Sequence, residues 1–282
     1  MKKVLLIITS LFGLALTINA SKFVNLTPMP KHITVAEGAY KLPESYSINA
    51  KHLPDSICVE AEKFVQTILK TTGCKARITS KKKADIEMSL DTNLPNEGYK
   101  LSVTKKKIQI SASTTSGFFY AFQTIKKIMP AHVMAGLNPE QAQAIIPTFQ
   151  TDKRPTIPCV EIYDEPRFWY RGFMLDCGRH FFTVDEIKHI LDGMAMYKMN
   201  YFHWHLTEDQ GWRFEVKKYP RLTSIGSVAS DCRMNDMEKG YYWLGKPYGP
   251  FFYTQEDCRE IVEYARNLHI EVIPEIDMPG HI

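Results

Sequence analysis

The sequence predicts an α/β protein in two parts: a small α+β domain at residues 21–160 and an incomplete (β/α)8 TIM-type barrel at residues 161–282. Short alternating stretches and two helical patterns fill the first part. In the second part strand patterns alternate with capped helices, which indicates a parallel sheet. That part has room for about three strands, whereas a closed barrel of this type needs about 250 residues.

The first twenty residues are typical of an export leader. Lys2 and Lys3 precede a mostly apolar run from Val4 to Ile18, and Ile18-Asn19-Ala20 is an acceptable cleavage site. No later apolar run approaches the roughly 20 residues that a membrane helix needs. We therefore expect export to the periplasm or the medium, with no membrane contact after cleavage of this signal peptide (1–20).

Charge and cysteine content exclude several classes of protein. Loss of the leader removes Lys2 and Lys3, so the net charge falls from +4 to +2, too little to favour nucleic acid. The six cysteines include no Cys-x-x-Cys pair, which excludes zinc ribbons and small disulfide scaffolds. Neither the disulfide pairing nor the oligomeric state follows from these patterns.

The first part contains two predicted helices and a predicted antiparallel sheet. Cys58–Leu69 has apolar residues at helical spacing, and Gly73 follows as a stop. A second helix runs from about Gly117 to Met129 and ends at Pro130. Alternating apolar residues predict strands at 86–90, 99–103 and 108–110.

A proline-rich connector is expected from Pro147 to Pro166, and strands alternate with helices after it. Thr183–Glu186 and Thr254–Asp257 are capping boxes, each of which opens a helix. The expected strands lie at 172–175, 201–206 and 270–276, with a long loop at 207–253. Side chains that follow these strands are candidates for a site, because barrel sites lie at the carboxyl ends of the strands.

The densest group of useful side chains belongs to the second of these strands and the loop after it. His203 and His205 point to the same side, because side chains alternate along a strand. Glu208, Asp209 and Trp212 follow. Carboxylates can bind sugar hydroxyls or transfer protons, and an indole can stack on a sugar face. The pattern therefore favours a carbohydrate site.

Each of these residues also has a purely structural interpretation. His203 and His205 could bind a metal in a hydrolase, or both imidazoles could be hydrogen-bonded inside a polar barrel interior. One of the carboxylates Glu208 and Asp209 could cap a backbone amide while the other faces the site. Trp212 could simply fill the loop.

The end of the third expected strand offers a histidine at a tight turn. His281 follows Asp277 after Met-Pro-Gly. A carboxylate from the neighbouring strand can order such an imidazole, and Asp209 is the obvious candidate.

Two arginines compete as the binder of sugar hydroxyls. Arg171 can donate two parallel hydrogen bonds to adjacent hydroxyls, but an arginine near a strand start is usually in a surface ion pair. Barrel geometry by itself favours Asp176, Arg179 and His180, which lie nearer the carboxyl end of that strand.

Three motifs occur in order along the chain: RGFMLD at 171–176 with Arg179-His180-Phe181 after it, HWHLTEDQGWR at 203–213, and IPEIDMPGH at 273–281. Together they resemble the family 20 glycoside hydrolases, the β-N-acetylhexosaminidases. The first part of the chain is similar to the α/β domain that precedes the barrel in that family.

The resemblance implies an enzyme that removes terminal N-acetylglucosamine or N-acetylgalactosamine from glycans or chito-oligosaccharides. It implies a retaining, substrate-assisted mechanism without a metal or organic cofactor. By the same resemblance Arg171 holds hydroxyls of the terminal sugar, Asp209 orders His281, and His281 contacts the general acid. We add Glu208 and Trp212 as candidate substrate-binding residues.

The resemblance also implies a neighbouring Asp-Glu pair after a fourth barrel strand, where the Asp orients the substrate acetamido group and the Glu is the acid/base. The sequence does not contain that strand, so we expect these 282 residues to be an inactive fragment. Two alternatives stay open: a metal-dependent barrel hydrolase that uses His203 and His205, and a non-catalytic sugar-binding module.

Overall fold

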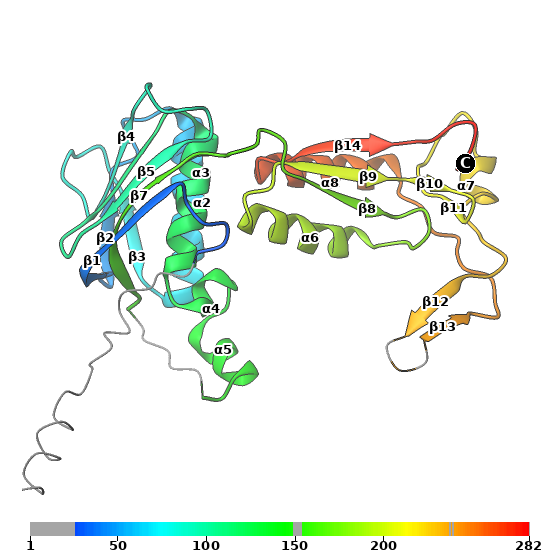
Figure 1. The fold of residues 1–282 in the computed structure, drawn as a ribbon, viewed down its shortest axis with the longest axis horizontal. Coiled ribbons are helices and arrows are strands. Elements are labelled where there is room, and N and C mark those ends of the chain that lie inside the picture. The colour runs from blue at the N-terminus through cyan, green and yellow to red at the C-terminus, as the bar shows by residue number, and fades with distance from the viewer. Residues whose placement is uncertain (1–25, 149–153, 237, 239, 282) are drawn as a thin grey trace, which may run out of the picture. The chain divides into compact units, whose positions relative to one another are not determined.

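The computed structural model describes residues 26–148, 154–236, 238 and 240–281. The signal peptide expected at 1–20 lies outside these residues and stays a prediction. The chain divides into two compact units, Met1–Glu165 (unit 1) and Pro166–Ile282 (unit 2) (Figure 1). No helix in the described ranges is long and apolar enough to cross a membrane.

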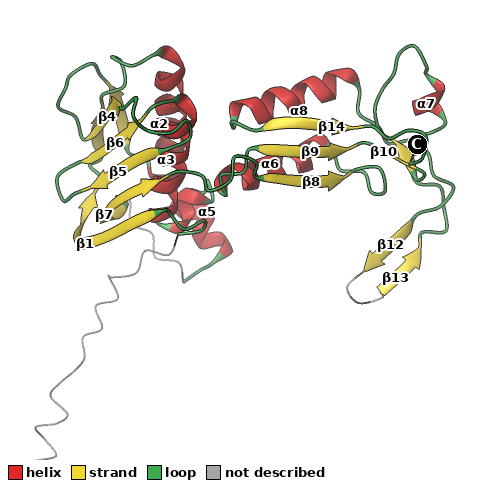
Figure 2. Cartoon of the chain, turned by 45° about the horizontal axis from the view of Figure 1, so that its top comes forward, coloured by secondary structure: helices red, strands yellow, loops and turns green. Residues whose placement is uncertain are grey.

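Unit 1 is one mixed sheet with its two long helices, α2 (Asp55–Thr72) and α3 (Thr115–Ile128), packed on one face (Figure 2). Seven strands lie in the order β1-β7-β5-β6-β4-β2-β3. Two short helices, α4 (Ala131–Met134) and α5 (Pro139–Ile145), follow α3. The strands are β1 (His32–Lys41), β2 (Ser45–Ile48), β3 (Lys75–Ile78), β4 (Ile86–Leu90), β5 (Tyr99–Val103), β6 (Ile108–Ala112) and β7 (Thr156–Asp164).

Both long helices of unit 1 lie where the apolar spacing predicts them. Gly73 ends α2 with a φ of 77°, a left-handed conformation that glycine adopts without strain. The Thr114 side chain caps α3 by accepting a hydrogen bond from the amide of Gly117. The rings of Phe64 and Phe122 stack with centroids 4.6 Å apart, so the two helices share one core against the sheet.

Two expectations for unit 1 are wrong. The sheet is not antiparallel throughout. β2 runs parallel to β3 and β4, and β4 runs parallel to β6, whereas the pairs β6–β5, β5–β7 and β7–β1 are antiparallel. The expected connector at Pro147–Pro166 contains β7, which lies between β1 and β5. Its Pro158 pairs with Ala39, next to a register shift in β1 that interrupts the regular ladder. Proline is tolerated at such irregular positions because no regular hydrogen bond is lost there.

Unit 2 has the predicted alternation of strands and helices. Its elements are β8 (Gly172–Asp176), α6 (Val184–Met196), β9 (Tyr201–His205), α8 (Gln255–Asn267) and β14 (Glu271–Glu275). β9 is central and pairs in parallel with β8 and β14. The parallel sheet and the incomplete barrel are thereby confirmed.

Local sequence signals account for the helices of unit 2. Both capping boxes form: Thr183 with Glu186 at the start of α6, and Thr254 with Asp257 at the start of α8. Along β9 the alternation is also as predicted, because Phe202 and Trp204 are buried while His203 lies on the other, more open side.

The connection expected as one long loop at 207–253 contains short elements. β10 (Thr207–Glu208) and β11 (Gly211–Trp212) form a tight hairpin directly after β9. A short helix, α7 (Arg221–Ser224), and a second hairpin, β12 (Arg233–Asp236) with β13 (Gly240–Trp243), come next. The first hairpin matters most here, because it decides where Glu208 points.

Candidate active site

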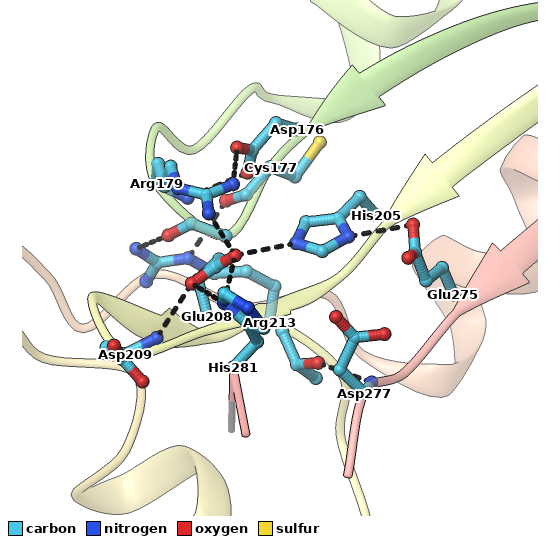
Figure 3. A network of polar contacts seen from close by, with 12 residues as sticks. Asp176, Cys177, Arg179, His205, Glu208, Asp209, Arg213, Glu275, Asp277 and His281 are labelled. Carbon is cyan, nitrogen blue, oxygen red and sulfur yellow. Dashed lines mark hydrogen bonds and ion pairs between the residues drawn. The ribbon is translucent and has the colours of Figure 1, made fainter. Parts of the chain in front are cut away.

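Polar side chains gather where the three parallel strands of unit 2 end (Figure 3). Asp176 is the last residue of β8, His205 of β9 and Glu275 of β14. The strand register pairs His205 with both neighbours, so the three residues form one row across the sheet. Parallel pairing thus brings together residues that are far apart in the sequence, as the sequence led us to expect.

Glu208 is the centre of the network. Its side chain is 3% exposed and sits between two imidazoles and a guanidinium. His281 Nδ1 lies 2.9 Å from its carboxylate, Arg179 forms an ion pair with it, and His205 Nε2 is 3.3 Å from its Oε1. The backbone amide of Asp209 donates to Oε2 over 3.3 Å. This buried carboxylate therefore has partners on each side.

The charges of Glu208 and His281 follow from their surroundings. Burial by itself would raise the pKa of Glu208, but the hydrogen bond from His281, the Asp209 amide and the charge of Arg179 outweigh it, so the pKa is lowered. The pKa of His281 is raised, first by its hydrogen bond to Glu208 and then by the charge on that carboxylate. Each member of the pair stabilises the charged form of the other.

Arg179 links Asp176 to Glu208. The Asp176 carboxylate accepts from the Arg179 amide over 3.0 Å and from the guanidinium over 2.5 Å. The Arg179 side chain stays about half exposed, so part of its guanidinium faces solvent at the carboxyl ends of the strands. A fixed guanidinium with free donors suits the binding of sugar hydroxyls.

Arg171 does not reach this site, and its prediction as a substrate-binding residue is wrong. It precedes β8, and its guanidinium donates to the carbonyls of Lys198 and Phe168 over 2.7 and 2.9 Å. The length of β8, about 17 Å at 3.3 Å per residue, separates it from the polar network. Of the two arginines weighed from the sequence, Arg179 is the one in the site, as strand direction alone had favoured.

Asp209 is not the partner of His281 either. The structure gives that contact to Glu208, the neighbouring residue. Glu208 is the last residue of β10 and is buried, whereas Asp209 begins the turn to β11 and is exposed. The charge of Asp209 still contributes to the raised pKa of His281, so it lies nearby without ordering the ring.

Trp212 fills the loop, as one of the two interpretations expected. It is buried in the loop, where its indole nitrogen donates to the Phe214 carbonyl. It also lines a cavity of about 860 Å³ together with Glu208, Asp209 and residues between 218 and 228. Stacking of a sugar on this indole stays a prediction.

His203 and His205 both contact a carboxylate, Glu275, and the metal considered for them stays an untested alternative. His203 Nε2 lies 2.5 Å and His205 Nδ1 2.8 Å from the same oxygen of Glu275. His205, Glu275 and Asp277 bring possible donor atoms within 4.8 Å of one another. A metal needs the bare nitrogen lone pair, whereas these nitrogens face a carboxylate directly as N–H donors. We assign the group to the hydrogen-bond network.

A buried guanidinium, which the sequence suggested as part of a carbohydrate site, holds the site loops together. Arg213 has no exposed surface. Its five N–H groups donate to five backbone carbonyls, those of Cys177, Gly178, Gln210, Ser227 and Phe251, over 2.9 to 3.4 Å. These carbonyls belong to the loops that also carry Arg179 and Glu208. No periodicity or spacing in the sequence could have revealed this role.

Comparison with known proteins decides the family. Residues 168–282 match "Glycosyl hydrolase family 20, catalytic domain", and residues 24–165 match "Glycosyl hydrolase family 20, domain 2". The chain belongs to glycosyl hydrolase family 20. The second match covers unit 1 and the first covers unit 2, with the polar network inside the catalytic domain.

Relatives of this family 20 chain are similar over nearly its whole length. A β-hexosaminidase of Porphyromonas gingivalis is 39% identical over 92% of this chain and 31% of its own length. A β-hexosaminidase of Vibrio furnissii is 35% identical over 91% of this chain and 38% of its own. The chain thus spans about a third of the length of these curated relatives.

Solved structures show the same fold. The GH20 exo β-N-acetylglucosaminidase of Vibrio harveyi, in complex with N-acetylglucosamine, superposes with a TM-score of 0.73 at 32% identity. That alignment covers 91% of this chain and 36% of the other. The β-N-acetylhexosaminidase of Bacteroides fragilis gives a TM-score of 0.68 at 33% identity, over 92% of this chain and 46% of the other.

Proposed function

We propose that the protein is an exported β-N-acetylhexosaminidase that removes terminal non-reducing N-acetylglucosamine or N-acetylgalactosamine from glycans or chito-oligosaccharides. The observation that carries the proposal is the buried Glu208, held by His281 and Arg179 at the carboxyl ends of a family 20 barrel sheet. Relatives named β-hexosaminidase support the same substrate class.

The proposed mechanism is retaining and substrate-assisted, one of the exceptions to the scheme with two protein carboxylates. The substrate acetamido oxygen attacks the anomeric carbon while a carboxylic acid protonates the leaving oxygen. Water then opens the cyclic intermediate and returns the proton to that group. No metal or organic cofactor takes part in these steps.

Residues of this chain have supporting roles in that scheme. Arg179 binds hydroxyls of the terminal sugar with the donors that Asp176 and Glu208 leave available. Glu208 fixes His281 through Nδ1, so Nε2 is the nitrogen that can reach the general acid. The Asp-Glu pair that the family resemblance requires has no counterpart at a barrel strand end within the described residues.

The test is hydrolysis by the product of the complete gene. We expect release of p-nitrophenol from the β-N-acetylglucosaminide and not from the β-glucoside, which lacks the acetamido nucleophile. The first sugar product should be the β-anomer by proton NMR. Stoichiometric zinc together with loss of activity to a chelator would refute this proposal and favour the alternative hydrolase with His203 and His205.

A second measurement addresses the 282 residues by themselves. We propose that residues 21–282 bind sugar weakly and do not hydrolyse it, because general acid catalysis contributes about 10²- to 10⁴-fold. Turnover of the aryl glycoside at the rate of the complete gene product would contradict this. Sequencing the N-terminus of the mature protein from a periplasmic or culture fraction tests cleavage after Ala20.

A further inference from the structure

His205 lies between two carboxylates that come from different elements. Its Nδ1 is 2.8 Å from Glu275 Oε2 at the end of β14. Its Nε2 is 3.3 Å from Glu208 Oε1 on β10. The residue is 6% exposed, so water contributes little to the solvation of either nitrogen. The imidazole therefore spans the space between Glu275 and the central carboxylate of the site.

This arrangement determines which protons the ring carries. An ionised carboxylate only accepts hydrogen bonds, so a nitrogen that faces one must carry the hydrogen. A neutral imidazole has a single N–H, whereas His205 faces a carboxylate with each nitrogen. The Nε2 contact is a charge contact with no well-aligned hydrogen bond among the described residues, so it depends on the positive charge of the ring.

The surrounding charges agree with a cation at this position. Burial by itself would lower the pKa of His205, but the hydrogen bond to Glu275 and the negative charges of Glu275, Asp176 and Glu208 raise it overall. The titratable and charged groups around the ring are Asp176 and Arg179 from β8 and its loop, Glu208 from β10, and Glu275, Asp277 and His281 from β14 and its loop. His203 of β9 contacts the same Glu275 oxygen as His205 does.

We infer that His205 is a positioning residue whose imidazolium bridges Glu275 to Glu208 and so holds the Glu208 carboxylate in place for His281. The inference rests on the proposed hydrolase function and adds to it the residue that positions Glu208. Glu208 orders His281, His205 orders Glu208, and Glu275 orders His205. When the ring loses a proton, it can donate to only one carboxylate, and the shorter contact, to Glu275, is the one it keeps.

Two substitutions, made in the product of the complete gene, separate the halves of this bridge. In His205→Asn the amide nitrogen takes the place of Nδ1 and can still donate to Glu275. In His205→Gln the amide nitrogen takes the place of Nε2 and can still donate to Glu208. If the Glu208 contact matters for turnover, His205→Asn lowers kcat by about tenfold, and His205→Gln lowers it less. If the ring only stabilises the fold, the order reverses, because the Glu275 contact is the shorter one.

The pH profile gives a readout that a merely structural role would not change. The general acid and His281 also lose protons on the alkaline side, and in the wild type His205 should add a further step to the fall of kcat there as it loses its second proton. Both variants should lack that step, since neither amide titrates. His189→Asn is the matched control, because His189 lies exposed on α6 and its Nδ1 is hydrogen-bonded to the Asp185 carbonyl. It should keep the wild-type profile.

Nitrogen NMR of the imidazole ring tests the same inference without any activity. In the wild type, both His205 nitrogens should stay protonated above the ordinary histidine pKa of about 6.5. In Glu275→Gln, the second proton should be lost at lower pH. If the wild type hydrolyses no N-acetylhexosaminide, the proposed function fails, but the NMR titration still decides the state of His205.

Three results would overturn the inference. They are a neutral His205 ring at neutral pH in the wild type, a higher kcat in His205→Asn than in His205→Gln, and an alkaline side of the kcat profile that is the same in both variants as in the wild type. Three results together support it. They are a lower kcat in His205→Asn than in His205→Gln, loss of the alkaline step in both variants, and a doubly protonated ring in the wild type.

Discussion

Arg213→Met should make local opening of the loops around the candidate site more favourable than a surface substitution of similar size does. The substitution keeps most of the side-chain volume and removes all five N–H donors. Five backbone carbonyls in the loops at 177–178, 210, 227 and 251 then lose a partner. Three of these hydrogen bonds, to Cys177, Gly178 and Ser227, are buried, so water does not readily replace them.

The expected change in the free energy of local opening depends on two opposing contributions. Hydrogen bonds to a charged group contribute about 1.5–3 kcal/mol each, but burial of the guanidinium costs several kcal/mol in lost hydration. Burial also lowers the pKa of Arg213, which shows the same opposition. Removal of one partner from a buried charged network usually costs about 3–5 kcal/mol. We therefore expect a loss of about 4 kcal/mol in the free energy of local opening.

Hydrogen exchange with mass spectrometry measures this quantity in the product of the complete gene. A loss of about 4 kcal/mol corresponds to about a thousandfold faster exchange in peptides that contain the amides of Trp212 and Tyr253. Both amides donate to carbonyls within the clamped loops. Arg259→Met is the control, since Arg259 forms an exposed ion pair with Glu256 on α8. Equal exchange in the two variants would refute the clamp.

The remaining predictions concern binding, capping and pH. Arg179→Lys should raise KM for an aryl N-acetylglucosaminide about tenfold through loss of charge-assisted hydrogen bonds, while Arg171→Lys leaves KM unchanged; equal KM values would contradict our placement of the two arginines. Thr183→Ala should lower the free energy of unfolding of unit 2 by about 1 kcal/mol in urea titrations, through loss of a helix cap; an unchanged midpoint would show that the cap is dispensable. The contact between Glu208 and His281 should weaken as pH rises, because a raised histidine pKa gives stabilisation that is complete below the unfolded pKa of about 6.5 and is lost as pH rises through the folded value. Because the pKa of Glu208 is lowered, its stabilising contribution is lost only when the pH falls below the ordinary range of a carboxyl group. Hydrogen exchange of peptide 276–281 should therefore be slowest between the folded pKa of Glu208 and the folded pKa of His281.

Local signals in the sequence predicted most of the helices and the barrel strands. The two capping boxes and the apolar alternation of β9 depend only on residues three or four positions apart, so the folded chain repeats what the sequence shows. β1 and β7 were missed because their signals are weak. β1 is mostly exposed, and β7 contains Pro158, a residue that normally argues against an interior strand.

The sequence predicted which residues lie at the candidate site better than it predicted the contacts between them. The sequence indicated correctly that the carboxyl ends of three strands converge, and it named Glu208 and His281 among the residues there. The choice between Glu208 and Asp209 depends on a two-residue pairing, β10 with β11. A slip of one residue would exchange the faces of both side chains, and no periodicity extends over so short a strand.

The arginine error has a different cause. Strand direction pointed to Arg179, and the family resemblance was matched to Arg171 at the start of the same strand. The structure supports the geometric argument, because parallel strands place only their carboxyl ends at the site. A motif match therefore needs the strand direction as a second check before a residue role is carried over.

Two glycines show how closely the site depends on packing. A Cβ on Gly178 would lie 2.9 Å from the Cβ of Glu208, and a Cβ on Gly211 would lie 2.2 Å from the guanidinium carbon of Arg213. Neither glycine has a positive φ, so the requirement comes from space and not from backbone conformation. The β8 loop can approach Glu208, and the β10–β11 hairpin can fold over Arg213, only because these positions have no side chain.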